Sequence, residues 1–173
     1  MADGVSGNSA VNQGAFATTV QDRMRILEKY KRIAMVGLSS NPFRPSHFAA
    51  IYMLSEGYDV IPVNPREQEV LGRRSYASLR VVPGPIEIVD IFREPAAVPD
   101  IVEEAIAVGA KVVWMQLGVI DERSAGRAKE AGLEVVMDRC VKIEHARLFG
   151  GLSTLGLNTG VISSQKRNHS QST

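Results

Sequence analysis

The sequence predicts an α/β protein in which one parallel β-sheet is doubly wound, with helices on both faces. Short continuous apolar runs recur along the chain, and segments of about ten residues with helical periodicity separate them. Gly or Pro stands at most of the junctions between these segments. Strands that are apolar along their whole length are typical of parallel sheets covered on both faces.

Apolar side chains at helical spacing predict five helices, at residues 19–30, 46–56, 95–108, 121–131 and 141–148. The first alternates apolar with charged positions, and the second is apolar over most of its length. Pro95 presets the backbone angle at the start of the third helix. Glycines just past the helix ends are expected to act as C-terminal caps, and these are Gly57, Gly109 and Gly132.

Apolar runs rich in Val and Ile predict five strands, at residues 33–36, 58–63, 86–92, 111–115 and 133–137. The first strand ends at Gly37, and only Glu87 and Asp90 interrupt the third. Residues 67–85 show a less regular pattern, with a short excursion and a small helical turn. The alternation of strands and helices predicts a single Rossmann-like domain of about five parallel strands.

Composition limits the kind of protein and its partners. The 173 residues fit one domain, and their 45% hydrophobic content can form a core without disulfides or metal. Twenty Lys and Arg residues nearly balance 19 Asp and Glu residues, which favours neither a nucleic-acid nor a membrane partner. No apolar run approaches the ~20 residues of a membrane-spanning helix. The single cysteine excludes an intramolecular disulfide.

The two ends of the chain differ in composition from the part between them. Residues 1–17 hold mainly small and polar side chains and predict a disordered tail, without the pattern of a secretory signal. Residues 18–150 are expected to form the domain, and residues 151–173 a flexible extension. No arginine precedes Arg23, so the sequence favours a cytoplasmic location over import into an organelle.

The loop after the first strand has the residues of an anion site. Ligands of open parallel sheets bind beyond the carboxyl ends of the strands. Here Gly37 allows a close approach, and small polar or cationic side chains follow it up to a helix that starts near Pro45. The candidate contacts are Gly37, Ser39, Ser40, Arg44, Ser46 and His47. His47 is interpreted as a hydrogen-bond partner at the helix start rather than as a catalyst.

The ends of the other strands supply further candidates. Asn64 and Pro65 stop the second strand, and Arg66 after them could contact a phosphate. Arg93 lies just beyond the third strand, which favours a site role over a salt bridge with Glu94. Gln116 is polar at the end of an apolar strand, whereas Trp114 is expected in the core.

The first loop does not match the common nucleotide fingerprints. It holds Gly37 alone where a dinucleotide site has three glycines, and no acidic residue follows the second strand to bind a ribose. A Walker loop is excluded, because no Gly-Lys-Ser or Gly-Lys-Thr follows a glycine-rich loop. Arg66 could instead meet an extra ribose phosphate, which both NADP and coenzyme A (CoA) carry.

Motifs at all five strand ends resemble the small single-domain CoA-binding protein family. The matching segments are Val36-Gly37-Leu38-Ser39, Pro42 to His47, Gly57 to Pro65, Asp90-Ile91-Phe92-Arg93, Trp114-Met115-Gln116 and Asp138-Arg139-Cys140. The same fold forms the nucleotide-binding domain of the succinyl-CoA synthetase alpha subunit. The resemblance covers about residues 30–148.

The resemblance implies a role for each loop. The 37–47 loop would hold the pyrophosphate, and Arg66 would lie near the 3′-phosphate. Four residues would border the adenine and the pantetheine arm, namely Phe92, Arg93, Gln116 and Leu117. The synthetases need further domains that this chain has no room for. The resemblance therefore implies CoA binding without the synthetase reaction.

Cys140 is the one candidate for reactive chemistry. With Arg139 beside it and a helix start after it, the thiol could have a lowered pKa and act as a nucleophile or form a mixed disulfide with CoA. The alternative is a small buried side chain. Cys140 and the histidines His47, His145 and His169 show no metal-ligand spacing, so no metal is expected.

The leading hypothesis is non-catalytic binding of CoA or an acyl-CoA at the carboxyl edge of the sheet, with no catalytic residue. One alternative is an NADP-linked oxidoreductase or a redox sensor that uses Cys140. A second alternative is an interaction module without a ligand. The sequence leaves open the acyl group, any protein partner and the oligomeric state.

Overall fold

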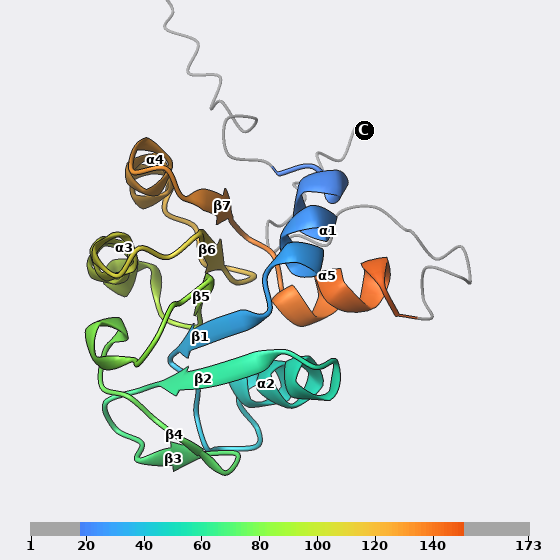
Figure 1. The fold of residues 1–173 in the computed structure, drawn as a ribbon, viewed down its shortest axis with the longest axis vertical. Helices are drawn as coiled ribbons and strands as arrows, with labels where there is room; N and C mark the ends of the chain where they lie inside the picture. Colours follow the sequence, from blue (N-terminus) through green and yellow to red (C-terminus); the bar gives the residue numbers. More distant parts are fainter. Residues whose placement is uncertain (1–17, 151–173) are drawn as a thin grey trace, which may run out of the picture.

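The computed structural model describes residues 18–150, which form a parallel sheet with helices on both faces (Figure 1). The strands are Arg32–Val36 (β1), Asp59–Val63 (β2), Ile88–Ile91 (β5), Val112–Met115 (β6) and Glu134–Val136 (β7). Their order across the sheet is β2-β1-β5-β6-β7, and every neighbouring pair is parallel. The predicted fold class is confirmed. The predicted tails, 1–17 and 151–173, lie outside the described residues.

The helices divide between the two faces of the sheet. They are Val20–Lys29 (α1), Pro45–Ser55 (α2), Val98–Ala107 (α3), Glu122–Glu130 (α4) and Val141–Leu148 (α5). The buried residues of α1, α2 and α5 share one core cluster, and those of α3 and α4 belong to the other. No helix in the described part of the chain is long and apolar enough to cross a bilayer.

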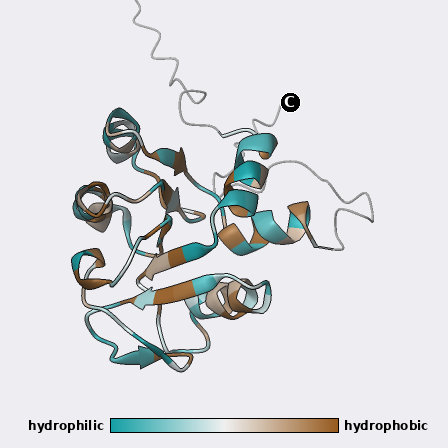
Figure 2. Cartoon of the chain, in the orientation of Figure 1, coloured by the Kyte–Doolittle hydropathy of each residue, from teal (hydrophilic) through white to brown (hydrophobic). Residues whose placement is uncertain are grey.

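Alternation along the strands separates these two cores. In β1, Ile33 and Met35 face the cluster beneath α1, α2 and α5, whereas Ala34 and Val36 face the opposite cluster. All four side chains are buried. Figure 2 shows the contrast between hydrophobic strands and the largely hydrophilic α1. Burial on both faces explains why the strands read as continuous apolar runs.

The irregular segment 67–85 contains a small second sheet. Two short antiparallel strands, Glu69–Val70 (β3) and Arg73–Arg74 (β4), are followed by a 3-10 turn at Leu79–Val81 (η1). A second 3-10 turn, Pro95–Ala97 (η2), leads into α3. The predicted helix 95–108 therefore begins as a 3-10 turn, and its α-helical part starts at Val98.

Gly37 joins three strand ends at the point where the strand order reverses. Its N–H donates to the Val63 carbonyl (2.8 Å), and the Phe92 N–H donates to the Val36 carbonyl (2.9 Å). The backbone of Gly37 has φ of +90°, and a Cβ built there would lie 2.5 Å from the Phe92 carbonyl oxygen. Only glycine satisfies both conditions, so the residue sets how closely β1, β2 and β5 approach at this edge.

Replacement of Gly37 by alanine is expected to destabilise the fold by about 3 kcal/mol, because backbone strain and a backbone clash add. Gly132→Ala is the matched control, since Gly132 has φ of +88° and open space around it. That variant should lose only about 1 kcal/mol from the strain. Urea unfolding measures the free energy of unfolding of both variants. Equal losses of stability would contradict the expected clash and show that the Gly37 loop relaxes around the added methyl group.

Candidate functional site

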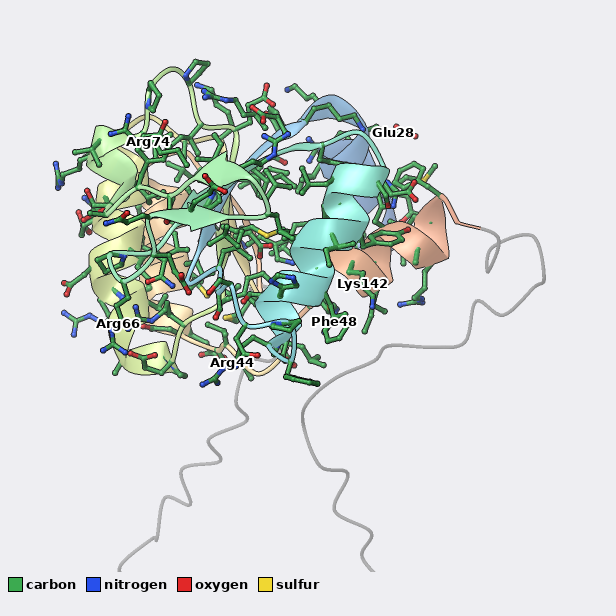
Figure 3. All side chains as sticks on the ribbon, turned by 90° about the horizontal axis from the view of Figure 1, so that it is seen from below. Glu28, Arg44, Phe48, Arg66, Arg74 and Lys142 are labelled. Carbon is green, nitrogen blue, oxygen red and sulfur yellow. The ribbon has the colours of Figure 1, made fainter. Side chains whose placement is uncertain are left out.

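A cleft of about 660 Å³ lies at the carboxyl edge of the sheet, above the point where the strand order reverses. Most of the residues predicted for the site line it, namely Gly37, Ser39, Arg44, Ser46, Asn64, Arg66, Phe92, Arg93, Gln116 and Leu117. Figure 3 shows the labelled Arg44 and Arg66 on the same side of the molecule. This is where a parallel α/β sheet is expected to hold a ligand.

Three predicted site residues do not line the cleft. The Ser40 backbone N–H and hydroxyl both donate to Glu67 Oε1, at 3.0 and 2.8 Å. His47 Nδ1 lies 2.9 Å from the Ser39 carbonyl oxygen, which agrees with a structural role at the helix start. Pro65 borders two smaller pockets beside the cleft. Direct ligand contact by these residues stays a prediction that the geometry does not support.

Hydrogen bonds fix the loop between β1 and α2 before any ligand binds. The buried Ser46 hydroxyl accepts from the Ser39 N–H (3.3 Å), and the Ser39 hydroxyl accepts from the Asn41 N–H (3.1 Å). Arg44 is the N-cap of α2, yet its side chain makes no capping hydrogen bond. Pro45 has no N–H and the His47 N–H donates to the Arg44 carbonyl (3.0 Å), so the first turn of α2 leaves the Ser46 N–H as its backbone donor at the edge of the cleft.

Asn64 connects the end of β2 to this loop. Its Nδ2 donates to the Leu38 carbonyl (3.0 Å), and its Oδ1 accepts from the Arg66 N–H (3.1 Å). The first bond ties the two neighbouring loops together, and the second fixes the turn that carries Arg66. The sequence indicated Asn64 only as a strand stop and contact, whereas both of its polar groups organise the cleft.

Some charged side chains of the cleft form ion pairs or hydrogen bonds with other side chains, and others do not. Arg93 forms an ion pair with Glu94 (3.0 Å), and the hydrogen bond from Arg93 lowers the pKa of Glu94 to about 2. Arg93 both lines the cleft and forms the salt bridge with Glu94, so its contact with a ligand stays a prediction. Hydrogen bonds from Ser40 likewise lower the pKa of Glu67.

Arg44 and Arg66 remain as the cations of the cleft without an ion pair, although the charge of Arg66 helps to lower the pKa of Glu94. Both side chains are exposed, and neither forms an ion pair or a hydrogen bond with another side chain in residues 18–150. The two carboxylates that line the cleft are occupied by other donors. A phosphate entering the cleft therefore meets two available guanidinium groups.

Gln116 forms the floor of the cleft. Its Nε2 donates to Asp90 Oδ1 (2.6 Å), and its Oε1 accepts from the Val141 N–H (3.4 Å). Both polar groups of the side chain are thus engaged within the protein, and only 4% of the residue is exposed. The predicted contact of Gln116 with a ligand stays a prediction, whereas its role in joining β5, β6 and α5 is visible.

Asp90 is a buried acid directly beneath this floor. The residue is 0% exposed, and no hydrogen-bond partner for its Oδ2 is present among the described residues. Burial raises the pKa of Asp90 to about 8, although the hydrogen bond from Gln116 opposes this shift. The carboxyl group is therefore largely protonated at neutral pH.

Cys140 also lines the cleft, at the N-cap of α5. The expected lowering of its pKa was wrong, because burial raises the pKa of the thiol more than the helix start lowers it. The Arg139 guanidinium donates to the Asp138 carbonyl (2.6 Å) and is not a source of the shift. The thiol is therefore mainly protonated at neutral pH, which weakens the interpretation as a redox sensor.

The neighbouring polar residues of α5 serve the fold. Glu144 pairs with Arg23 of α1 (2.8 Å) with both side chains buried, and His145 Nδ1 lies 3.0 Å from the Tyr52 hydroxyl. Burial lowers the pKa of His145. In the part of the chain that the structure describes, no group of three or more His, Cys, Asp and Glu side chains could hold a metal ion.

Several cleft residues were not predicted from the sequence, namely Pro45, Glu67, Glu94, Val119 and Ile143. Val119 and Ile143 look like ordinary core positions, and only the tertiary fold brings them to the cleft. Asp90 did carry a signal, since a carboxylate near the end of an apolar strand is costly unless it has a purpose. Trp114 is buried, as expected, and its Nε1 donates to the Arg139 carbonyl (2.8 Å).

Strand order, loop geometry and unpaired cations together define a Rossmann-like nucleotide-binding domain. The chain belongs to the CoA-binding domain family, whose model matches residues 31–146. This confirms the family that the strand-end motifs indicated. The match spans every strand of the parallel sheet and all the residues that line the cleft.

Two similar proteins match most of this chain. The uncharacterized protein YneT of Bacillus subtilis is 44% identical over 121 residues, which cover 70% of this chain and 90% of YneT. The solved structure of a hypothetical protein from Pyrococcus horikoshii OT3 is 45% identical, with a TM-score of 0.76, and covers 79% of this chain and 96% of that one.

A more distant structure shares the fold alone. It is the dinucleotide-forming acetyl-coenzyme A synthetase 1 of Ca. Korarchaeum cryptofilum, at 22% identity and a TM-score of 0.59. The match covers 66% of this chain but 27% of the synthetase. The present chain thus corresponds to one portion of that larger enzyme.

Replacement of Asp90 by asparagine is expected to remove a pH dependence of stability. The folded protein holds a proton on Asp90 from its ordinary pKa of 3.8 up to about 8, whereas the unfolded chain does not. The free energy of unfolding should therefore fall as pH rises through this window, by up to about 1.4 kcal/mol per pH unit. Urea unfolding at several pH values measures the difference between wild type and variant.

The exposed Asp100 of α3 provides the control for loss of a carboxylate. Around Asp90, the neighbouring strands contribute Met35 and Trp114, which do not titrate, and α5 contributes the Cys140 thiol. A constant difference between wild type and Asp90→Asn from pH 4 to pH 8 would contradict the assignment of the buried proton.

Proposed function

We propose that the cleft binds CoA or an acyl-CoA and that the protein holds this ligand without catalysing a reaction on it. The observation that carries the proposal is the pair of unpaired guanidinium groups, Arg44 and Arg66, on a cleft whose carboxylates are already bound. Membership of the CoA-binding domain family supports CoA as the class of ligand.

The end of the cleft near β1 and β2 suits the phosphates. Gly37 and Ser39 line the cleft there, and the first turn of α2 offers the Ser46 N–H. Arg44 precedes this turn, and Arg66 follows β2, which is the neighbouring strand in the sheet. The diphosphate would lie against the turn, and the ribose phosphate would lie towards Arg66.

The other end of the cleft suits the pantetheine arm. Beyond β5 and β6 the lining gains apolar side chains, namely Phe92, Leu117, Val119 and Ile143, beside the paired Arg93 and Glu94 and the engaged Gln116. A cleft with a cationic end and an apolar end matches a ligand that has phosphates at one end and a thiol or thioester at the other. The cleft volume of about 660 Å³ is in the usual range for a cofactor.

A role without catalysis is proposed because the polar side chains near the cleft are already paired or are protonated. Glu144 and His145 are committed to Arg23 and Tyr52, and the Cys140 thiol is mainly protonated. No nucleophile paired with a base lines the cleft in residues 18–150. A cytoplasmic location fits the single cysteine of the chain.

Removal of either cation is expected to weaken CoA binding. Arg44→Ala and Arg66→Ala should each cost about 1.5–3 kcal/mol, the usual contribution of a charge-assisted hydrogen bond. That corresponds to roughly a ten- to hundred-fold increase in Kd by calorimetry. Lys111→Ala is the control, because it removes the same charge at the opposite edge of the sheet, just before β6.

The choice of ligand distinguishes this function from its rivals. CoA and acetyl-CoA should raise the melting temperature of the protein, NADP should raise it much less, and acetyl-CoA should be recovered unchanged by mass spectrometry. A larger shift with NADP would favour the oxidoreductase, and no shift with either would favour the interaction module. Hydrolysis of acetyl-CoA would overturn the non-catalytic role.

A further inference from the structure

Cys140 lies at the end of the cleft opposite to the phosphate-binding cations. The cleft crosses the sheet in strand order, from Arg66 after β2 to Gln116 after β6 and Cys140 after β7. A ligand that places its phosphates near Arg66 therefore extends its far end towards Cys140. In CoA that far end carries the thiol.

The start of α5 can stabilise a thiolate at Cys140 once it forms. Cys140 is the N-cap residue of α5, where the helix start favours a negative charge on the sulfur. In the resting protein, burial has the larger effect and keeps the thiol protonated. The helix start therefore stabilises the thiolate once it has formed, whereas the protonated thiol of the resting protein reacts slowly with disulfides from solution.

Asp90 is a second and independent feature of this end of the cleft. Its Oδ1 accepts from Gln116 Nε2 (2.6 Å), and Gln116 Oε1 accepts from the N–H of Val141 (3.4 Å), the residue that follows Cys140. Its Oδ2 is fully buried and has no partner among the described residues. An unsatisfied carboxyl oxygen at the floor of the cleft is a costly arrangement unless the carboxyl group exchanges a proton or meets a ligand group.

We propose that Cys140 is a covalent acceptor for CoA, which it takes from a disulfide of CoA bound in the cleft. The Cys140 sulfur attacks the CoA sulfur, the original S–S bond breaks, and a mixed disulfide between Cys140 and CoA forms. The other half of the disulfide leaves as a thiolate and takes up the proton that Cys140 loses, directly or through Asp90. The inference rests on the proposed function, because the cleft must first hold the CoA moiety.

Binding supplies the selectivity of this reaction. A protonated, half-buried thiol reacts slowly with disulfides from solution, but a disulfide held in the cleft has a high effective concentration beside it. The site should therefore accept CoA from a CoA disulfide far faster than it accepts glutathione from glutathione disulfide. The reverse reaction with a reducing thiol would release CoA.

Intact-mass spectrometry tests the proposal, and the single cysteine of the chain makes the adduct unambiguous. Wild-type protein is incubated with CoA disulfide or with glutathione disulfide at equal concentration. The expected result is one CoA adduct that forms at least ten times faster than the glutathione adduct. Arg44→Ala should slow the CoA adduct, and adenosine 3′,5′-bisphosphate should compete with it. Equal rates with both disulfides would overturn the proposal.

Two further measurements distinguish failure of the covalent step from failure of CoA binding. Calorimetry with reduced CoA under reducing conditions reports the cleft alone, so binding without any adduct would refute the covalent step and leave the proposed function standing. No binding would refute both. In Asp90→Asn, the loss of a negative charge next to the thiol should move the rise of adduct rate with pH to lower pH, and an unchanged pH profile would exclude Asp90 from the step.

Discussion

The cleft depends on the close backbone contact at Gly37. There β1 ends, its last hydrogen bonds join β2 and β5, and the Phe92 carbonyl occupies the space that a side chain would need. Because the strand order reverses at this point, the loops after β2 and β5 separate on either side of the β1–α2 loop. The positions of Asn64, Arg66 and Arg93 along the cleft all follow from this one contact.

The proposed preference of the cleft for anions rests on local pairing of charges rather than on net charge. The chain carries a formal charge of +1, and the cleft itself contains two carboxylates. Ser40 binds one of them and Arg93 binds the other, so their negative charge is partly compensated. Arg44 and Arg66 keep their donors available, so under the proposed function the cleft can bind phosphate without an overall basic surface.

The sequence predicted the fold well because its signals are local. Continuous Val and Ile runs, proline at helix starts and glycine at helix ends each act within a few residues. The loop from Gly37 to Ser46 was also predictable, because a strand end, a turn and a helix start follow one another along the chain. Ser40, His47 and Arg93 were harder, since their partners lie on other loops or depend on side-chain direction.

The floor of the cleft could not be read from the sequence, because it is built by contacts between distant segments. Asp90, Gln116 and Val141 are joined only after β5, β6 and α5 have packed together. Their arrangement also decides the state of Cys140, since the burial that raises its pKa arises from the same packing. A thiol that its sequence neighbours suggested as activated is thereby kept mainly protonated at neutral pH. The packing that builds the floor of the cleft therefore also sets the protonation state of Cys140.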